Sequence, residues 1–351
     1  MYTLNEIIGS LTKFIGNLWQ FIFQMCMSLA PVLFIPGLTF ILLFVTVVIW
    51  FERKYLAHAM LRMGPVYAGR VFGWLQCIAD FLKILTKEII VPSDADKTLY
   101  YLAPILLPIV DGLAIAFIPV APDWVIFRGF GYGLPLFLAI VSLGPLCPLI
   151  AGWAANNKYT VIGSLRAAYM CIAAEIPLLL SAAGIAILAG SFDLVDIVEA
   201  QSKMWFIIPG FLGALVFFIG ILAEAERTPF DISVAEQEIV FGWRTEYSGI
   251  LFMLTMMAEY ISLLAWELLF ITLFLGGYKG PVIFGSPFIS NIAWVLIKLG
   301  ILTAIIILLR TVFPRFRLDQ AIKIGWRYLI PLAIANIYIA IIIKLFFPFV
   351  V

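Results

Sequence analysis

The chain has 351 residues, of which 64% are hydrophobic and 12% are charged, and its mean hydropathy is +1.10. Soluble globular domains carry about 25% charged residues, so this composition excludes a water-soluble enzyme and predicts an all-α polytopic membrane protein. The formal net charge of +1 gives no reason to expect nucleic acid as a partner.

Apolar segments of membrane-spanning length recur along the chain. About 20 apolar residues cross the hydrocarbon core of a bilayer. Residues 1–25, with Glu6 and Lys13, predict a surface helix that leads into the first span. No room is left for a soluble domain, so residues 1–351 are expected to form a single integral membrane domain. The eight predicted spans are residues 29–51, 98–119, 132–153, 166–189, 205–224, 249–275, 291–311 and 328–349.

Lys and Arg residues are concentrated in the odd-numbered connections between these spans. The second, fourth and sixth connections hold only Arg128, Lys203 and Lys279. Cytoplasmic loops carry the excess of basic residues, so the odd connections are expected in the cytoplasm and both termini outside, in a multi-pass protein of the cell (plasma) membrane. The first connection alone contains Arg53, Lys54, Arg62, Arg70, Lys83, Lys87 and Lys97.

The first connection, residues 52–97, also contains a predicted amphipathic helix. Apolar residues recur at helical spacing from Leu75 to Ile89, and polar residues such as Asp80 fall on the opposite face. Pro92 and Asp94 are expected to end the helix. This pattern indicates a helix at the cytoplasmic membrane interface. Composition alone favours a simple membrane anchor over a functional role for this helix.

Ionisable residues occur inside the predicted spans, where charge is costly and usually functional. The segment 224–260 adds a cluster of seven carboxylates with Arg227 and Arg244. Acids that lie close together inside a membrane could pass protons to one another. The structural alternative is an ion pair between Lys298 and either Glu259 or Glu267. The acids and the lysine inside or at the ends of spans are Asp111, Glu175, Glu224, Glu259, Glu267 and Lys298.

Cofactor-binding motifs are not found in the sequence. The four cysteines are scattered, and no Cys-x-x-Cys pair suggests an iron–sulfur cluster or a zinc site. No glycine-rich nucleotide fingerprint is present, and His58 is the only histidine. The chain is therefore expected to bind no metal and no covalent cofactor.

Short motifs follow one another in a fixed order along nearly the whole chain. This set resembles the quinone-site membrane subunit of respiratory complex I, the H-subunit family of NADH-quinone oxidoreductases. The family includes relatives in reduced-deazaflavin dehydrogenases and membrane-bound hydrogenases. The motifs are Glu52-Arg53-Lys54, Arg62-x-Gly64-Pro65, Leu75-Gln76, Ile78-Ala79-Asp80, Thr86-Lys87-Glu88, Gly152-Trp153-Ala154-x-Asn156-x-Lys158-Tyr159, Gly163-x-Leu165-Arg166-Ala167-Ala168, Glu175, Ala223-Glu224-x-x-Arg227-x-Pro229-Phe230-Asp231, Glu236-x-Glu238, Gly242, Glu246-Tyr247, Glu259-Tyr260, Pro314-Arg315-Phe316-Arg317-x-Asp319-Gln320 and Gly325-Trp326.

The resemblance implies a role for particular residues. Glu175, Glu224 and Glu259 match the buried glutamates of a proton-coupling path. The cavity for a quinone-like lipophilic carrier, which would be ubiquinone, menaquinone or methanophenazine, is implied to involve the first loop and the acidic fifth connection. The residues implied to line or support it are Arg53, Arg62, Asp80, Arg227, Asp231, Glu236 and Glu238.

The resemblance further implies a subunit of a redox-driven proton pump that oxidises NADH or a reduced deazaflavin. Its partners would be peripheral iron–sulfur subunits and antiporter-like membrane subunits. Two alternatives stay open: a stand-alone ion-coupled transporter, and the membrane subunit of a hydrogenase-type complex without a quinone site. The roles of Asp111, Glu267 and Lys298 are also open.

Overall fold

The computed structural model describes residues 37–69, 72–122, 124–127, 131–282 and 286–346. The predicted surface helix at residues 1–25 lies outside these ranges. The described residues are helical with no strand, which confirms the all-α prediction. The main helices are α2 (Leu38–Ala59), α3 (Leu75–Leu85), α4 (Lys97–Ile115), α5 (Gly133–Val141), α6 (Leu146–Ala154), α7 (Lys158–Ala189), α9 (Phe211–Glu224), α11 (Gly249–Phe274), α12 (Pro287–Val312) and α14 (Ile330–Phe346).

Shorter elements connect or extend these helices. Helix α8 (Leu194–Ala200) precedes α9, and α10 (Glu236–Ile239) with the 3-10 turn η1 (Gly242–Arg244) precedes α11. Helix α13 (Leu318–Lys323) continues through the π-helical turn η2 (Ile324–Leu329) into α14.

The described part of the chain contains six segments that are long and apolar enough to cross a membrane, so the polytopic prediction is confirmed. Helix α9 is a shorter apolar helix, and α2 is apolar until Glu52. The first predicted span begins outside the described residues, and the count of eight stays a prediction. The six segments are Lys97–Ile115, Gly133–Ala154, Lys158–Ala189, Gly249–Phe274, Pro287–Val312 and Leu318–Phe346.

Local sequence explains the limits of the longest helix. The Asn157 side chain accepts a hydrogen bond from the Tyr159 amide, so α7 begins eight residues before the predicted span. At the other end Gly190 adopts a left-handed conformation with φ of +78°, the usual glycine C-terminal cap. The predicted span 132–153 instead consists of α5 and α6, separated by a turn that ends at Pro145.

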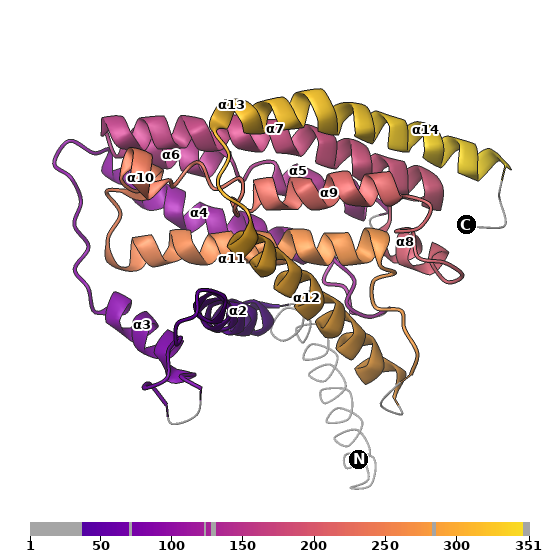
Figure 1. Ribbon diagram of the computed structural model, residues 1–351, viewed down its shortest axis with the longest axis horizontal. Coiled ribbons are helices and arrows are strands. Elements are labelled where there is room, and N and C mark those ends of the chain that lie inside the picture. Colours follow the sequence, from indigo (N-terminus) through magenta and orange to yellow (C-terminus); the bar gives the residue numbers. More distant parts are fainter. Residues whose placement is uncertain (1–36, 70–71, 123, 128–130, 283–285, 347–351) are drawn as a thin grey trace, which may run out of the picture.

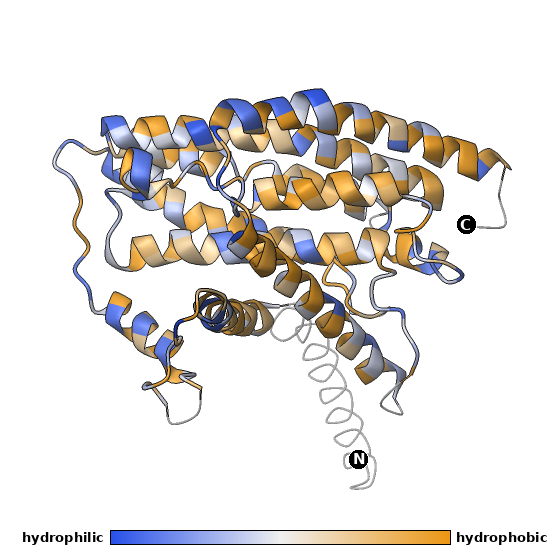
Figure 2. Ribbon diagram, in the orientation of Figure 1, coloured by the Kyte–Doolittle hydropathy of each residue, from blue (hydrophilic) through white to orange (hydrophobic). Residues whose placement is uncertain are grey.

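Most of the long helices form one bundle. Helix α7 packs against α6, α9 and α14, while α11 packs against α4 and α9. Figure 1 shows these helices side by side, with α12 crossing them obliquely and α2 and α3 on the same side as α12. Figure 2 shows hydrophobic residues along α9, α12 and α14, and hydrophilic residues gathered at α10 and α13.

Aromatic side chains fill the middle of the bundle. Trp266 of α11 lies 5.8 Å from Phe137 of α5 and 5.9 Å from Phe217 of α9, measured between ring centroids. Phe217 also lies 5.6 Å from Phe274. All four rings are almost completely buried, so they fix the position of α11, the helix on which Glu259 and Glu267 lie.

The predicted amphipathic helix is present as α3, and none of its residues is buried. Its apolar residues Leu75, Ile78 and Leu82 are exposed, which suits contact with lipid. Trp74 stacks on Trp50 of α2 at 5.2 Å, and this contact holds the start of α3 against α2.

The helix ends at Leu85, earlier than Pro92. Beyond it the chain contacts the start of α11: the Ile90 amide donates a hydrogen bond to Ser248 Oγ, and the carbonyls of Lys87 and Glu88 lie close to Gly249.

Candidate functional site

A cavity of about 580 Å³ lies between α2, α3 and α11. Apolar side chains form most of its wall, among them three methionines of α11. Arg53 and Asp80 line it and form an ion pair that connects α2 to α3. We call it the apolar cavity; its other lining residues are Leu42, Val45, Thr46, Ile49, Glu52, Leu56, Cys77, Ile78, Phe81, Ile84, Phe252, Met253, Met256, Met257, Tyr260 and Arg310.

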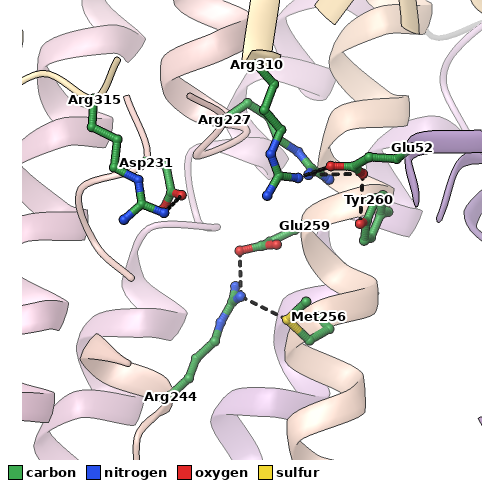
Figure 3. A network of polar contacts seen from close by, with 9 residues as sticks. All are labelled: Glu52, Arg227, Asp231, Arg244, Met256, Glu259, Tyr260, Arg310 and Arg315. Carbon is green, nitrogen blue, oxygen red and sulfur yellow. Dashed lines mark hydrogen bonds and ion pairs between the residues drawn. The ribbon is translucent and has the colours of Figure 1, made fainter. Parts of the chain in front are cut away.

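A buried charge cluster closes one part of the apolar cavity (Figure 3). Glu52 Oε1 lies 3.3 Å from Arg227 Nη1, and Glu52 also pairs with Arg310 of α12. The Tyr260 hydroxyl donates to Glu52 Oε2 at 2.9 Å, and the Arg227 guanidinium lies 4.4 Å from the Tyr260 ring centre. Two arginines and a hydroxyl therefore stabilise one carboxylate.

A second cavity of about 170 Å³ lies beyond this cluster, and we call it the polar cavity. Arg315 Nη2 lies 2.7 Å from Asp231 Oδ2 in its wall. Burial raises the pKa of Asp231, and the opposing effect of Arg315 is smaller. Arg227 Nε and Nη2 are buried without a partner among the described residues; such donors normally bind water or a polar ligand. The lining residues are Glu226, Arg227, Thr228, Asp231, Val234, Phe241, Arg244, Met256, Glu259, Tyr260, Arg310 and Arg315.

A third cavity of about 50 Å³ lies within the bundle, and we call it the inner cavity. Its wall brings together four acids, Asp111 of α4, Glu224 at the end of α9, Glu226 after it and Glu259 of α11. The remaining lining residues are Leu107, Val141, Gly144, Pro145, Pro148, Cys171, Ala225, Trp243, Arg244, Ala258 and Ser262.

Arg244 is the cation of the inner cavity. Its Nη1 lies 2.5 Å from Glu259 Oε1 and 3.4 Å from Met256 Sδ, as Figure 3 shows. The turn η1 places it there because Gly163 of α7 allows the backbone of Gly242 and Trp243 to approach closely. A Cβ atom at Gly163 would lie 2.5 Å from the Trp243 nitrogen.

The three cavities share walls in series. Met256, Tyr260 and Arg310 line both the apolar cavity and the polar cavity. Glu226, Arg244 and Glu259 line both the polar cavity and the inner cavity. A continuous row of ionisable side chains therefore connects a large apolar chamber to acids inside the helix bundle.

Several predicted site residues meet in this row. Glu224 and Glu259 line the inner cavity, and Glu175, half-buried on α7, lies near enough for its charge to act on Glu224. Arg227 and Asp231 line the polar cavity.

Besides Glu175, three predicted residues are not among the described lining residues of these cavities. Arg62 is exposed, and Glu238 forms an exposed ion pair with Arg166 at 2.5 Å. Glu236 begins α10, and its side chain lies outside the described part of the structure.

The ion pair suggested as the structural alternative for Lys298 is wrong. Lys298 Nζ donates to the carbonyls of Leu275, Gly277 and Lys279 at 2.7, 2.8 and 3.0 Å. These carbonyls follow the end of α11, where a cation is favoured by the helix dipole. Glu267 instead accepts a hydrogen bond from Thr303 at 2.8 Å, and Glu259 pairs with Arg244.

Four residues of the cavity walls were not predicted as site residues from the sequence: Glu52, Glu226, Arg244 and Arg310. Glu52 could have been found, because it is the first charge after residues 14–51, which carry none. Among the described residues no group of three or more His, Cys, Asp or Glu side chains could hold a metal ion.

Comparison with known proteins identifies the family. Residues 32–341 match the family described as NADH dehydrogenase. The NADH-quinone oxidoreductase H subunit of Bacillus cytotoxicus is 42% identical over 305 residues, covering 87% of this chain and 91% of the relative. The H subunits of Geobacillus kaustophilus (42%, 88% and 92% covered) and Brevibacillus brevis (41%, 87% and 90% covered) are similarly close. With six segments long and apolar enough to cross a membrane among its described residues, the chain belongs to the H-subunit family of NADH-quinone oxidoreductase, a membrane subunit of respiratory complex I.

Proposed function

We propose that this chain couples reduction of a quinone-like carrier to proton movement, as a membrane subunit of a redox-driven proton pump. It forms much of the carrier cavity and starts the buried acidic path. The observation that carries the proposal is that successive cavities share walls. The apolar cavity shares residues with the polar cavity, and the polar cavity shares other residues with the inner cavity that holds the acids.

The apolar cavity has the character that a lipophilic carrier requires. Ligand sites are mostly apolar with a few polar groups that fix orientation. Here Ile49, Ile78 and Phe81 offer apolar contact, while Arg310 stands where a carrier oxygen could accept a hydrogen bond. The names of the relatives specify quinone as their acceptor, and we propose a quinone or a similar lipophilic carrier for this chain.

The acids beyond the polar cavity form the proposed start of the proton path. Glu259 and Glu224 both line the inner cavity, and Glu175 of α7 acts electrostatically on Glu224. Reduction of the carrier changes the charge beside Glu52, Arg227 and Arg310, and the shared wall transmits that change to Arg244 and Glu259. A proton moves along the path when each acid can both lose and regain it.

Electrons would reach the carrier from iron–sulfur subunits on the cytoplasmic side, since the chain carries no motif for a redox cofactor. Antiporter-like membrane subunits would continue the proton path. Leu61, Met63 and Tyr67 in the first connection are almost fully exposed, and such apolar surface supports docking of another subunit. The basic odd connections support a cytoplasmic position, with both termini outside the plasma membrane.

The test is substitution of the path acids in the reconstituted complex. Glu224→Gln and Glu259→Gln keep the shape of the side chain and remove the exchangeable proton. We expect both complexes to assemble, with coupled carrier reduction and proton pumping lower by about 10²-fold and electron transfer to a soluble acceptor unchanged. Asp319→Asn, at an exposed position of α13, is the matched control. Normal pumping in both variants would refute the proposal.

A stand-alone ion transporter is the competing function, supported by the acids around the inner cavity. Such a transporter works as a single chain, whereas a subunit purifies with its partners. A monodisperse single chain that transports ions after reconstitution would replace the proposal.

A hydrogenase-type complex without a quinone site would be favoured if filling the apolar cavity, by Ile49→Trp, left electron transfer to every lipophilic acceptor unchanged.

A further inference from the structure

Helix α9 ends in a hydrogen-bonded turn that places Glu226 in an unusual backbone conformation. The Arg227 amide donates to the Leu222 carbonyl at 2.9 Å and the Glu226 amide donates to the Ala223 carbonyl at 3.3 Å. These two bonds define a Schellman motif, whose left-handed position is normally glycine. Here that position is Glu226, with φ of +49°.

A side chain at this position is energetically unfavourable. The left-handed conformation is unfavourable for an L-residue other than glycine, because its Cβ atom approaches the following carbonyl oxygen. An observed backbone strain of this kind justifies a search for a function. Glycine would make the same turn without the unfavourable conformation. The turn therefore does not explain Glu226, and a role for its carboxylate has to be sought.

The surroundings of Glu226 distinguish it from the other two residues of the shared wall. Of the three side chains that line both the polar cavity and the inner cavity, Arg244 is a permanent cation. Arg244 Nη1 lies 2.5 Å from Glu259 Oε1, so these two side chains are partners in an ion pair. Glu226 has a neutral partner: Ser233 Oγ donates to its Oε2 at 2.6 Å.

We propose that Glu226 carries protons between the polar cavity and the inner cavity; this inference rests on the proposed function of those cavities. Glu226 then supplies an exchangeable proton in the wall that the two cavities share. Ser233 orients one carboxylate oxygen of Glu226 and leaves the other free for exchange.

The transfer conserves charge and involves no electrons. On one side an O–H bond of a water or an acid in the polar cavity breaks as the O–H bond of Glu226 forms. On the other side that bond breaks as the carboxylate of Glu224 is protonated. The reverse sequence restores Glu226. Both sides are reachable because one carboxyl group borders both cavities.

The charges that face Glu226 come from several elements. Burial raises its pKa to about 7, and Glu259 of α11 and Asp231 of the following loop act in the same direction. Arg244 of η1 and the hydrogen bond from Ser233 oppose this rise. Glu224 and Asp111 face it across the inner cavity. A group with a pKa near working pH exchanges protons most efficiently.

The experiment uses the whole complex, reconstituted in vesicles, with Glu226→Gln and Glu226→Gly. Glutamine keeps the shape but not the proton, and glycine relieves the strained turn. Both variants should assemble, reduce a soluble acceptor normally and pump protons about 10²-fold more slowly. Glu226→Asp should restore part of the pumping. Infrared difference spectra should show a protonated carboxyl band that titrates near neutral pH and is missing in Glu226→Gln.

Each other outcome is decisive. Normal pumping in Glu226→Gln, together with lost pumping in Glu224→Gln, would overturn the role of Glu226 and leave the proposed function standing. Normal pumping in all of these variants would overturn both. If neither Glu226→Gln nor Glu226→Gly assembles while Asp319→Asn does, Glu226 is a structural residue and the proposal fails.

Discussion

Glu52 Oε1 and Arg227 Nη1 lie 3.3 Å apart at the boundary between the apolar cavity and the polar cavity. Their side chains are only 5% and 8% exposed, although 175 residues separate them in sequence. The pair is therefore the contact that joins α2 to the turn after α9. Glu52 lines the apolar cavity and Arg227 lines the polar cavity, so the pair spans the boundary between them.

Removal of the Glu52 charge is expected to destabilise the protein. Glu52→Gln leaves Arg227 and Arg310 without their carboxylate, and breaking a buried ion pair in this way costs about 3–5 kcal/mol. The apparent melting temperature of the complex in detergent measures the effect. Glu238→Gln is the control, because its ion pair with Arg166 is exposed and is worth about 0–1 kcal/mol. Equal melting temperatures for the two variants would contradict the prediction.

Loss of the contact between α3 and α2 is expected to weaken carrier binding. Asp80→Ala removes the ion pair with Arg53 in the wall of the apolar cavity. The KM for a lipophilic acceptor should rise several-fold, while reduction of a soluble acceptor stays unchanged. Arg62→Ala, at an exposed position outside the three cavities, should leave both activities as in the wild type. An unchanged KM in Asp80→Ala would make α3 a membrane anchor only.

The role of Lys298 is expected to be structural. Lys298→Met leaves three carbonyls at the end of α11 without their donor and should lower stability by roughly 3 kcal/mol. The number of protons pumped per carrier reduced should not change in the complex that remains. Lys344→Met, which loses one carbonyl contact at an exposed position, should cost less. A changed pumping ratio in Lys298→Met would place this lysine in the proton path.

Glu226 is expected to make stability depend on pH. Its pKa is raised from 4.5 to about 7 in the folded chain, so the folded state binds more protons than the unfolded state between these two values. Stability from this group is present at low pH and is lost as pH rises through about 7. The melting temperature should therefore fall less steeply between pH 5 and pH 8 in Glu226→Gln than in the wild type. The same dependence of melting temperature on pH in both proteins would show that Glu226 does not titrate in this range.

Topology is tested with single cysteines in a background without the native ones. Cysteines at positions 62 and 323 should react with an impermeant reagent in inverted vesicles and not in intact cells, since these positions belong to basic connections. A cysteine at position 203 should show the opposite pattern. Labelling of both 62 and 323 from outside would reverse the predicted orientation.

Much of the fold could be predicted because apolar length and helical spacing are local properties. The segment 249–275 and helix α11 differ at their ends by one residue, and the spacing from Leu75 predicted α3. The break between α5 and α6 was missed because the apolar run 129–157 continues through it without a charge.

The site was harder to predict, since partners far apart in sequence leave no local pattern. The acids of the row could be recognised from the sequence because they are charges in an apolar chain. The contact between Glu52 and Arg310 could not, because 258 residues separate the two in sequence. The Lys298 prediction failed for a related reason. Its partners are backbone carbonyls, which every residue carries. The sequence therefore gives no sign of them, and a nearby acid was predicted as the partner instead.

Because neighbouring cavities share lining residues, binding in the apolar cavity and proton binding beyond it must affect each other equally. If occupation of the apolar cavity alters the affinity of Glu226 or Glu224 for protons, through Tyr260, Arg310 and the side chains beyond them, then proton concentration must alter the affinity for the occupant by the same factor. An outward driving force on protons would then oppose binding of one redox form of the carrier. Under the proposed function, we expect an imposed proton gradient to change the binding of the carrier through this reciprocity.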